Sequence, residues 1–430
     1  MVLVGVAWLA SSSALGAQET GSLRIEQAVS LALSRNERAR IADLNVTVAS
    51  AAVDKARTAF LPTLGVAGIY TQKPDDVIDP TKSHSYSATT SAVLSQPLLN
   101  AGAFPLYASA RRTLDATAAQ TTDDKRVLAF DAARAFFTAL SAEAVLAAAN
   151  TRLDTAKANL KDTQDRVAGQ FAGTSSNDVT RASIDLANAV VEVENDKGAT
   201  RVAYVSLAYT INAPIPVHLD PPDAILAAGR QTVPAADGLV RLAIARRPDL
   251  QSKRFLGVAA HDFAQEPLLR LVPTLGVSGT FQLSTDETLV GHGFYNTEFV
   301  TLTLAWPLFD AGVRYADKRA RDAAASIADL TTDELARNVD EQVRAACATL
   351  EAAQNALSAA KTAQDAAHKN VTETDVLYKQ GLAKAIELVD ATDSAFLADV
   401  AYVTSEYGVA LAYLSLRQAM GLDPLGTVLQ

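Results

Sequence analysis

The sequence lacks most of the residues on which catalytic and disulfide-bonded proteins depend. Its 430 residues include one cysteine, Cys347, so neither a disulfide within the chain nor a cysteine-based zinc site can form. Nucleophile-elbow, Walker and GxGxxG patterns do not occur. The five histidines are scattered, without metal-ligand spacing: His84, His218, His261, His292 and His368. We therefore expect no enzyme, no metal and no cofactor.

Basic clusters and long apolar runs are missing as well. The formal net charge is −10 without a Lys/Arg cluster, which disfavours nucleic acid or anionic lipid as the main partner. After the first residues no run of 18 apolar residues occurs, so helices are not the means by which this chain would enter a membrane. Residues 1–17 resemble the rear part of a secretory signal peptide, which predicts export.

What the sequence does contain is an internal duplication. "FLPTLGVAG" at Phe60 returns as "LVPTLGVSG" at Leu271, and "SQPLLNAG" at Ser95 returns as "AWPLFDAG" at Ala305. The pairs "SLALSRN" with "RLAIARR" and "DVTRA" with "ELVDA" follow the same order at offsets of 211 and 209 residues. The chain is therefore predicted to hold two copies of one unit. The expected parts are repeat 1 at 18–212, a proline-rich linker at 213–236, repeat 2 at 237–421 and a tail at 422–430.

Each unit is predicted to run helix, strand, loop, strand and then two long helices. The first helix is expected near residues 23–59, where apolar residues recur at three- and four-residue spacing. Proline cannot continue a helix and biases the preceding residue toward an extended backbone. Pro62 and Pro273 therefore mark helix-to-strand joints, and Pro97 and Pro307 mark the ends of the returning strands.

The segments between these prolines alternate apolar and polar residues. From Leu275 to Leu283 and from Val300 to Trp306 the alternation is strong, and residues 86–94 follow it more weakly. Segments of about ten residues with this period fit transmembrane barrel strands, although alternation alone leaves open a half-buried hairpin on a soluble core. The long polar loops "TQKPDDVIDPTKSH" and "STDETLVGHGFYN" favour the barrel, because such connections face outside water.

The remaining segments are long and helical. Residues 103–170 and 313–380 are alanine-rich and, apart from Pro105, free of interior proline, which predicts rods of roughly 100 Å. The first rod ends at Gly169 and Gly173, the second at Gly381, and another long helix follows each break. Long alanine-rich antiparallel pairs suit coiled-coil packing. The predicted fold class is mainly α with transmembrane β.

Four strands are too few to close a membrane barrel. An open sheet in lipid leaves edge N–H and C=O groups unpaired, at a cost of several kcal/mol each. The chain must therefore assemble, because the smallest bacterial barrels have about eight strands. Two copies would supply eight strands and three would supply twelve, and only the larger ring leaves a usable lumen.

At this point the chain resembles a known family. The repeat, the paired hairpins, the rods and the phrase "YKQGLAKAIELVDATDSAFLADV" from Tyr378 are similar to the TolC-type outer-membrane efflux proteins, over Leu23 to Gly421. The resemblance implies a homotrimer with a twelve-stranded β-barrel in the outer membrane and an α-barrel tunnel in the periplasm. It also implies a periplasmic adaptor and an inner-membrane pump of the RND, ABC or MFS type as partners.

Candidate entrance residues cluster at the helix turns. Glu387 and Asp390 share a helix face, so three protomers would bring six carboxylates toward a narrow mouth and attract cations. The alternative is that these acids serve the helix dipole, as Asp178 with Ser175 resembles a capping box. The residues in question are Asn177, Asp178, Tyr378, Lys384, Glu387 and Asp390.

The family resemblance favours an entrance role for these residues. It implies that Tyr378 is the gating tyrosine, bonded to the acidic turn at Asn177 and Asp178. Many family gates add an arginine two residues after the turn glycine, but this chain has Ala383 there, with Lys384 beside it.

Three functions follow from this reading. The leading one is a passive outer-membrane exit duct of a tripartite efflux pump for drugs and other small molecules. One alternative is the outer-membrane component of a type I protein secretion system. Another, from a different class, is a soluble periplasmic coiled-coil scaffold or adaptor, which four strands make a poor fit.

Overall fold

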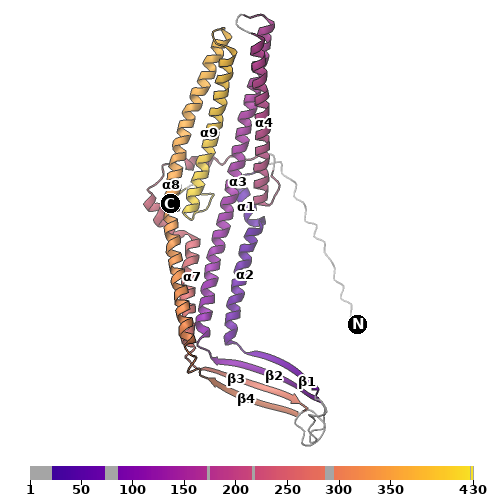
Figure 1. Ribbon diagram of the computed structural model, residues 1–430, viewed down its shortest axis with the longest axis vertical. Coiled ribbons are helices and arrows are strands. Elements are labelled where there is room, and N and C mark those ends of the chain that lie inside the picture. The colour runs from indigo at the N-terminus through magenta and orange to yellow at the C-terminus, as the bar shows by residue number, and fades with distance from the viewer. Residues whose placement is uncertain are drawn as a thin grey trace. The chain divides into compact units, whose positions relative to one another are not determined.

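The computed structural model describes most of the chain (Figure 1). The described residues are 22–72, 86–171, 175–215, 218–285, 295–426 and 428–429. The expected signal peptide at 1–17, Gly173, His84 and His292 lie outside them. The described helices and strands confirm the predicted class, which is mainly helical with four antiparallel strands.

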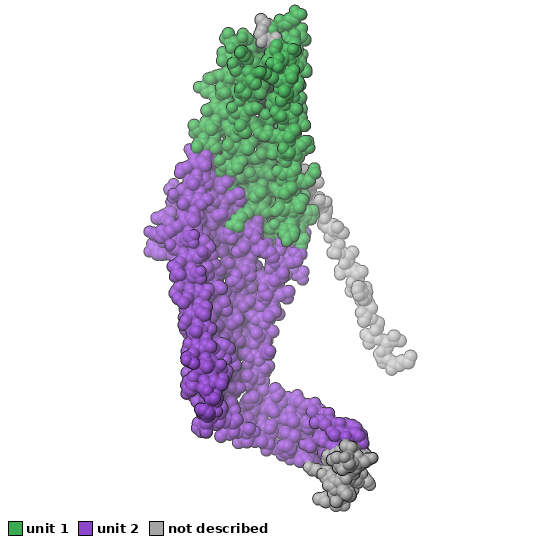
Figure 2. Space-filling model, in the orientation of Figure 1, with its two compact units in different colours: residues 1–32, 132–227, 359–407 green, residues 33–131, 228–358, 408–430 purple. Residues whose placement is uncertain are grey.

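The chain divides into two compact units that cut across the two repeats (Figure 2). Unit 1 comprises residues 1–32, 132–227 and 359–407, and unit 2 comprises residues 33–131, 228–358 and 408–430. Each unit therefore draws on both copies of the duplicated sequence. The two units are described separately below.

Each repeat opens with two helices rather than the single helix expected near 23–59. Helix α1 (Ile25–Arg35) ends one residue before Asn36, whose side chain accepts a 2.9 Å hydrogen bond from the Arg38 amide and caps α2 (Glu37–Arg57). In the second repeat α6 (Ala236–Arg246) ends before Arg247, and α7 (Pro248–Leu269) begins with proline. Asparagine at an N-cap and proline at the first helical position both favour a new helix, which explains the break.

The strands begin and end close to the prolines. After the short 3₁₀ turn η1 (Thr58–Phe60), Pro62 precedes strand β1, and Pro273 directly precedes β3. Pro307 follows β4, but Pro97 lies inside β2, where a register irregularity between Pro97 and Leu99 accommodates it. Proline lacks a backbone N–H, so a bulge is one of the places where a strand tolerates it. The strands are β1 (Thr63–Gln72), β2 (Tyr86–Leu99), β3 (Thr274–Ser284) and β4 (Tyr295–Ala305).

Four long helices follow the strands in pairs. They are α3 (Ala103–Ala168), α4 (Ser176–Ile211), α8 (Val313–Lys379) and α9 (Ala385–Ala419), and the two rods agree with the predicted 103–170 and 313–380. The expected linker contains a further short helix, α5 (Asp223–Gly229). Ile225 is only 3% exposed in α5, so burial of an apolar side chain stabilises a turn of helix among the linker prolines.

The core of unit 1 lies where the long helices pack. Phe136 and Phe137 of α3 are fully buried, and the Phe137 ring lies 6.4 Å from that of Tyr407 on α9. A second cluster joins Ala149, Val193 and Phe396 from α3, α4 and α9. One or two large side chains per layer, set among alanines, let long helices approach closely.

Close helix packing also holds unit 2. The Thr121 hydroxyl on α3 donates a 2.9 Å hydrogen bond to the Ala42 carbonyl oxygen on α2, which requires the two backbones to be near each other. Among the described helices, α3 alone has the length and apolar composition of a membrane-crossing helix. Its Leu128 and Phe130 are fully buried, so these apolar residues serve the protein core.

A buried arginine joins three helices of unit 2. Arg247, 7% exposed, binds both carboxylate oxygens of Asp249 at 2.6 and 3.0 Å, Gln342 of α8 at 2.6 Å and the Ala419 carbonyl of α9 at 3.2 Å. Burial alone would raise the pKa of the Asp249 carboxyl, but the hydrogen bonds and charge of Arg247, with the Leu250 amide, hold that pKa below its usual value. Asp249 therefore stabilises the folded chain in its ionised form.

We predict that Asp249→Asn lowers the free energy of unfolding at pH 7 by about 3 kcal/mol, because it leaves a buried guanidinium without its counter-charge. A lowered pKa stabilises the fold above the unfolded-state pKa of about 3.9 and loses that contribution as pH falls through the folded-state value. The deficit of the variant should therefore shrink below about pH 4. Thermal unfolding of detergent-solubilised protein, followed by circular dichroism, measures this.

The matched control is Asp237→Asn, which removes the partner of Arg344 in an exposed pair with side chains 80% and 51% exposed. Exposed pairs contribute about 0–1 kcal/mol. A deficit for Asp249→Asn that stayed constant down to pH 3 would contradict the assigned role of its charge.

Candidate functional site

The four strands of unit 2 form one antiparallel sheet in the order β1-β2-β3-β4 (Figure 1). Their register places the apolar rows of all four strands on the same face. Leu64 pairs with Leu94, Ala92 with Phe281, and Val277 with Leu302. The row continues across the sheet through Val66, Tyr70, Leu275, Val300 and Leu304.

The opposite face of the sheet is rich in hydroxyl side chains. Thr63 pairs with Ser95, and Ser278 lies between Ser95 and Thr301. The Thr89 and Ser284 hydroxyl oxygens lie 3.3 Å apart on this face. The sheet is thus mainly apolar on one side and richer in hydroxyl groups on the other, as the alternation in residues 274–306 predicts, although Ile69, Val93 and Phe299 lie on the hydroxyl face.

The apolar face is largely exposed in the part of the chain that the structure describes. Val300 is 77% exposed, Leu64 and Val66 are each 71% exposed and Leu302 is 66% exposed. A hairpin packed on a soluble core would bury one of its faces, and continuous apolar surface of this kind marks an interaction site or a membrane contact. The soluble-hairpin alternative therefore does not fit these strands.

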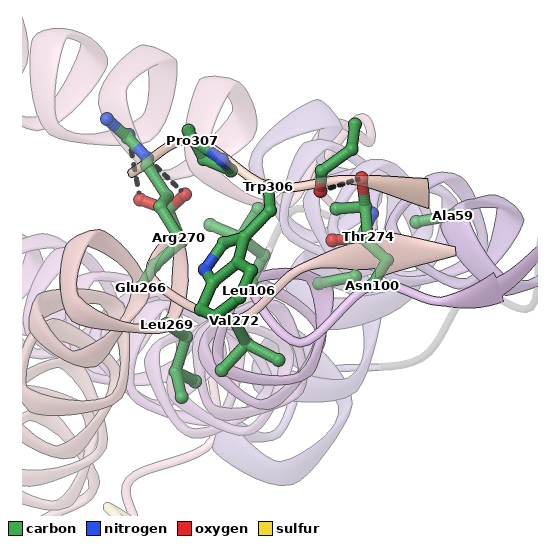
Figure 3. A pocket seen from close by; sticks show the side chains of 13 residues that line it. Ala59, Asn100, Leu106, Glu266, Leu269, Arg270, Val272, Thr274, Trp306 and Pro307 are labelled. Atoms are coloured by element: carbon green, nitrogen blue, oxygen red, sulfur yellow. Dashed lines mark hydrogen bonds and ion pairs between the residues drawn. The ribbon is translucent and has the colours of Figure 1, made fainter. Parts of the chain in front are cut away.

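A cavity of about 670 Å³ lies where the sheet meets the helices of unit 2 (Figure 3). Trp306 projects over it toward Leu106 and Val272, and its indole N–H donates a 2.9 Å hydrogen bond to the Leu271 carbonyl. Trp306 is 57% exposed. A tryptophan with one polar tip and a large apolar ring suits the boundary between membrane and water.

The charges beside this cavity are paired to one another. Glu266, 8% exposed, accepts two hydrogen bonds from Arg270 at 2.7 and 2.8 Å and one from Arg321 at 2.6 Å. Arg270 also binds Asp317 of α8 at 2.7 Å. The network joins α7 to α8 directly before β3. It therefore holds in place the connection from α7 to β3, which contains Pro273.

The two helical hairpins of unit 1 end in related turns. Gly381 has φ +75°, and the Gly381 and Leu382 amides donate to the Tyr378 and Leu377 carbonyls at 3.0 and 2.8 Å. This is the Schellman arrangement, in which a left-handed residue closes the helix. In the first repeat the left-handed residue is Gln170, with φ 53°.

Gly169 serves its turn in a different way from Gly381. It precedes the left-handed residue, and a Cβ atom on it would lie 2.8 Å from Cε2 of Phe171. Glycine at this position makes room for the Phe171 ring rather than for a positive φ.

The two acids closest to the turns cap the helices that follow. Asp178 accepts hydrogen bonds from the Ser175 amide at 2.9 Å and the Ser175 hydroxyl at 2.8 Å. Glu387 accepts a 3.4 Å hydrogen bond from the Lys384 amide, the equivalent contact in the second repeat. These contacts match the capping alternative, and Glu387 nevertheless stays exposed.

The other predicted entrance residues lie on the surface of the same turns. Asn177, Lys384 and Asp390 are exposed, and among the described residues no ion pair engages the Asp390 carboxylate or the Lys384 ammonium. Glu387 and Asp390 lie one helical turn apart in the first turns of α9. The geometry leaves Asp390 free to present its charge to solvent.

Among the described residues, no hydrogen bond joins Tyr378 to the acidic turn that the resemblance implies. It is 5% exposed, its hydroxyl oxygen lies 3.4 Å from that of Thr163 on α3, and its ring lies beneath the guanidinium of Arg166 at 4.5 Å. Asp178 is bound to Ser175 instead. The Tyr378 hydroxyl and the Asp178 carboxylate thus have other partners within the described chain, and the expected bond at the entrance stays a prediction.

A second, largely buried arginine joins three helices of unit 1. Arg152 of α3 binds Asp185 at 3.1 Å and Glu192 at 2.6 Å on α4, and Asp393 at 2.7 Å on α9. Its guanidinium also lies 5.2 Å from the centre of the Phe396 ring. Burial raises the pKa of the Asp185 carboxyl, the charge of Asp393 raises it further and Arg152 opposes both. One cation thus holds three carboxylates together.

Two stretches of the chain, residues 28–213 and 239–422, match the sequence model of the outer membrane efflux protein family. This chain belongs to the outer membrane efflux protein family. The match takes in most of both repeats, and the fold described above is the one found in solved structures of such channels.

Several solved structures share the fold over nearly the whole chain. CusC has a TM-score of 0.81 at 16% identity, with 93% of this chain and 92% of CusC covered. The open state of the MtrE channel of Neisseria gonorrhoeae has a TM-score of 0.78 at 20% identity, covering 95% and 91%. VceC of Vibrio cholerae has a TM-score of 0.76 at 15% identity, covering 93% and 96%. No curated protein matches the sequence.

Membership of this family fixes the broad function. The protein is an outer-membrane efflux channel with a helical tunnel in the periplasm, and it is not an enzyme. Members of the family work with a periplasmic adaptor and an inner-membrane pump in tripartite systems. The alternatives of protein secretion and of a soluble scaffold are not favoured.

Sequence reasoning found the turns but missed the arginines around them. Arg166 lies four residues before the left-handed Gln170, and Tyr378 lies three residues before the left-handed Gly381, so the duplication does not relate the two positions. Arg152 has no sequence signal either, because its partners lie 33 to 241 residues away.

The two faces of β4 provide a matched test of membrane contact. We predict that Val300→Arg, on the apolar face, destabilises the assembled sheet by roughly 2–4 kcal/mol, the cost of a charge at the lipid midplane. Thr301→Arg, on the hydroxyl face one residue away, should be tolerated. Outer-membrane fractionation and heat-modifiable migration on gels measure both, and equal loss of assembly in the two variants would contradict the assignment of the faces.

Proposed function

We propose that three copies of this chain form a passive exit duct with a twelve-stranded β-barrel. The observation that carries the proposal is the register of the sheet, which gathers most of the apolar side chains on one face and leaves β1 and β4 at the ends of the strand order. Edge strands in lipid must pair with another chain. Three sheets give a ring wide enough for a lumen, whereas an eight-stranded barrel is filled by its own side chains.

Helix α4 supports the same assembly. Besides its buried stripe, it carries a second row of exposed residues at alternating spacings of four and three, the spacing of a coiled-coil seam. Five of its eight positions are apolar, and Tyr209 is 84% exposed. The row, here called the outer α4 seam, consists of Ile184, Asn188, Val191, Asn195, Gly198, Val202, Val205 and Tyr209. A helix of a neighbouring copy is the partner that this spacing fits.

The outer α4 seam has a built-in control. Val191 lies in the seam and is 60% exposed, whereas Val190 lies beside it and is 44% exposed. We predict that Val191→Asp weakens the trimer and lowers its dissociation temperature, while Val190→Asp has little effect. Native mass spectrometry in detergent, with an expected mass of three 45.2 kDa chains for the wild type, measures this. A wild-type monomer in detergent would overturn the assembly.

The turn region of unit 1 serves as the periplasmic entrance in this proposal. Three copies of Glu387 and Asp390 supply six carboxylates around the axis, and like charges that face a narrow mouth attract cations. The capping contact of Glu387 with the Lys384 amide uses one carboxylate oxygen and leaves its charge in place. Helix capping and cation selection are therefore compatible roles.

We predict that the double variant Glu387→Gln, Asp390→Asn lowers the cation preference of the channel, measured as a reversal potential in a salt gradient across a planar bilayer. The double variant Asp333→Asn, Glu334→Gln removes the same charge from exposed residues in the middle of α8 and should change the preference less. Equal shifts in the two variants, or none in either, would reject a ring at the entrance.

Energy for transport must come from other proteins of the system. The chain has no nucleotide-binding motif, so we propose that an adaptor and an inner-membrane pump of the RND, ABC or MFS type supply it. Small drug-like molecules are the proposed cargo. Expression of the full chain in cells that lack their own exit duct tests this, with restored drug resistance as the expected outcome.

A further inference from the structure

A cation of the first repeat stacks on an aromatic ring of the second repeat, close to the two turns of unit 1. Arg166 stands three residues before Gly169 on α3, and Tyr378 stands three residues before Gly381 on α8. The guanidinium carbon lies 4.5 Å from the centre of the Tyr378 ring. A cation of the first repeat thus meets an aromatic ring of the second repeat between the hairpins of unit 1.

The contact is largely shielded from water. The Arg166 side chain is 17% exposed and Tyr378 is 5% exposed. The guanidinium also donates to the Asp162 carboxylate at 2.7 Å and to the Tyr378 carbonyl oxygen at 3.4 Å. Desolvation strengthens a cation–π contact well beyond its value at the surface. The stack therefore ties the last turn of α3 to the last turn of α8.

The turn after α3 completes the site. Phe171 follows the left-handed Gln170, and its ring centre lies 6.0 Å from the same guanidinium. Gly169 lacks the Cβ atom that would lie 2.8 Å from this ring. The turn is thus shaped to bring Phe171 back over Arg166, so that aromatic rings from both hairpins contact one cation.

Other residues that could lock the hairpins are engaged elsewhere. The carboxylate of Asp178 caps α4 through Ser175, and the Tyr378 hydroxyl reaches Thr163 only at 3.4 Å. Ala383 occupies the position where a cation would follow the turn glycine of the second repeat. The cation nearest to Tyr378 comes instead from the first hairpin.

We infer that Arg166 is the positioning residue that locks the two hairpins together at the channel entrance, by stacking between Tyr378 and Phe171. The inference rests on the proposed function of these turns as the entrance. Opening then requires the ring of Tyr378 to leave the guanidinium, and the phenol hydroxyl has no part in the lock.

Single-channel recording of the full chain in planar bilayers tests this lock. Arg166→Met and Tyr378→Leu should each raise the open probability roughly three- to tenfold, the range that loss of one shielded cation–π contact supplies. Tyr378→Phe keeps the ring and should leave the open probability unchanged, as should Asp178→Asn. Arg181→Met, which removes an exposed cation of α4, is the matched control.

The variants separate the lock from a tyrosine–carboxylate gate. Unchanged gating in Arg166→Met, or opening by Tyr378→Phe and Asp178→Asn, would overturn the role of Arg166. Absence of any conductance in the wild type would instead refute the proposed channel. Phe171→Ala tests the same contact with less risk of misfolding than the changes at the buried residues, because Phe171 is 60% exposed. This variant should also raise the open probability.

A thermal-unfolding cycle on Arg166→Met, Tyr378→Leu and their double variant provides a second measurement. Residues in direct contact give non-additive changes. Additive changes would mean that the two side chains do not interact, and would also overturn the lock.

Discussion

The structure depends on one constraint, which is that an amphipathic sheet of four strands cannot complete itself. Its apolar face holds residues such as Val300 that are more than three-quarters exposed, and the backbone groups at the outer edges of β1 and β4 have no partner strand among the described residues. In water, exposure of the apolar face is unfavourable because of the hydrophobic effect. In lipid, the backbone N–H and C=O groups of the edge strands would lack hydrogen-bond partners. Both costs disappear together only when sheets from several chains join in a membrane.

The long helices are also a consequence of the four-stranded sheet. A chain that delivers two hairpins to one sheet must run away from the membrane and return, and the duplication does so with α3–α4 and α8–α9. Alanine lets the helices pack closely, so that a few large side chains such as Phe136, Phe137 and Tyr407 suffice for the core of unit 1. Exposed surface on α4 then remains for neighbouring copies.

Much of this architecture is predictable from the sequence, because strong local signals encode it. Proline at 62 and 273, period-two alternation after it and proline-free alanine-rich stretches predict the strands and the rods. The break at Asn36 and helix α5 escaped prediction. A cap is hard to distinguish from a polar residue inside a helix, and α5 depends on burial of Ile225. Pro97 misleads because a bulge accommodates it within β2.

The site was less predictable, because its contacts join residues far apart in the chain. Asp178 and Glu387 were found from their spacing to the turns, yet spacing alone does not separate a cap from a charge ring. Arg166 and Tyr378 are separated by 212 residues, and Arg152 and Asp393 by 241. Nothing in the local sequence points to either pair.

Arg152 and Arg166 of unit 1 are held by contacts of different strength. Arg152 is bound by carboxylates from α4 and α9, and removing such a buried cation would leave three acids facing one another. Arg166 is held mainly by aromatic rings and one exposed carboxylate, contacts that a modest displacement of α8 can break and re-form. Motion at the turns therefore costs far less than motion at Arg152. The proposed gate at the ends of the hairpins would therefore open without breaking the contacts of Arg152.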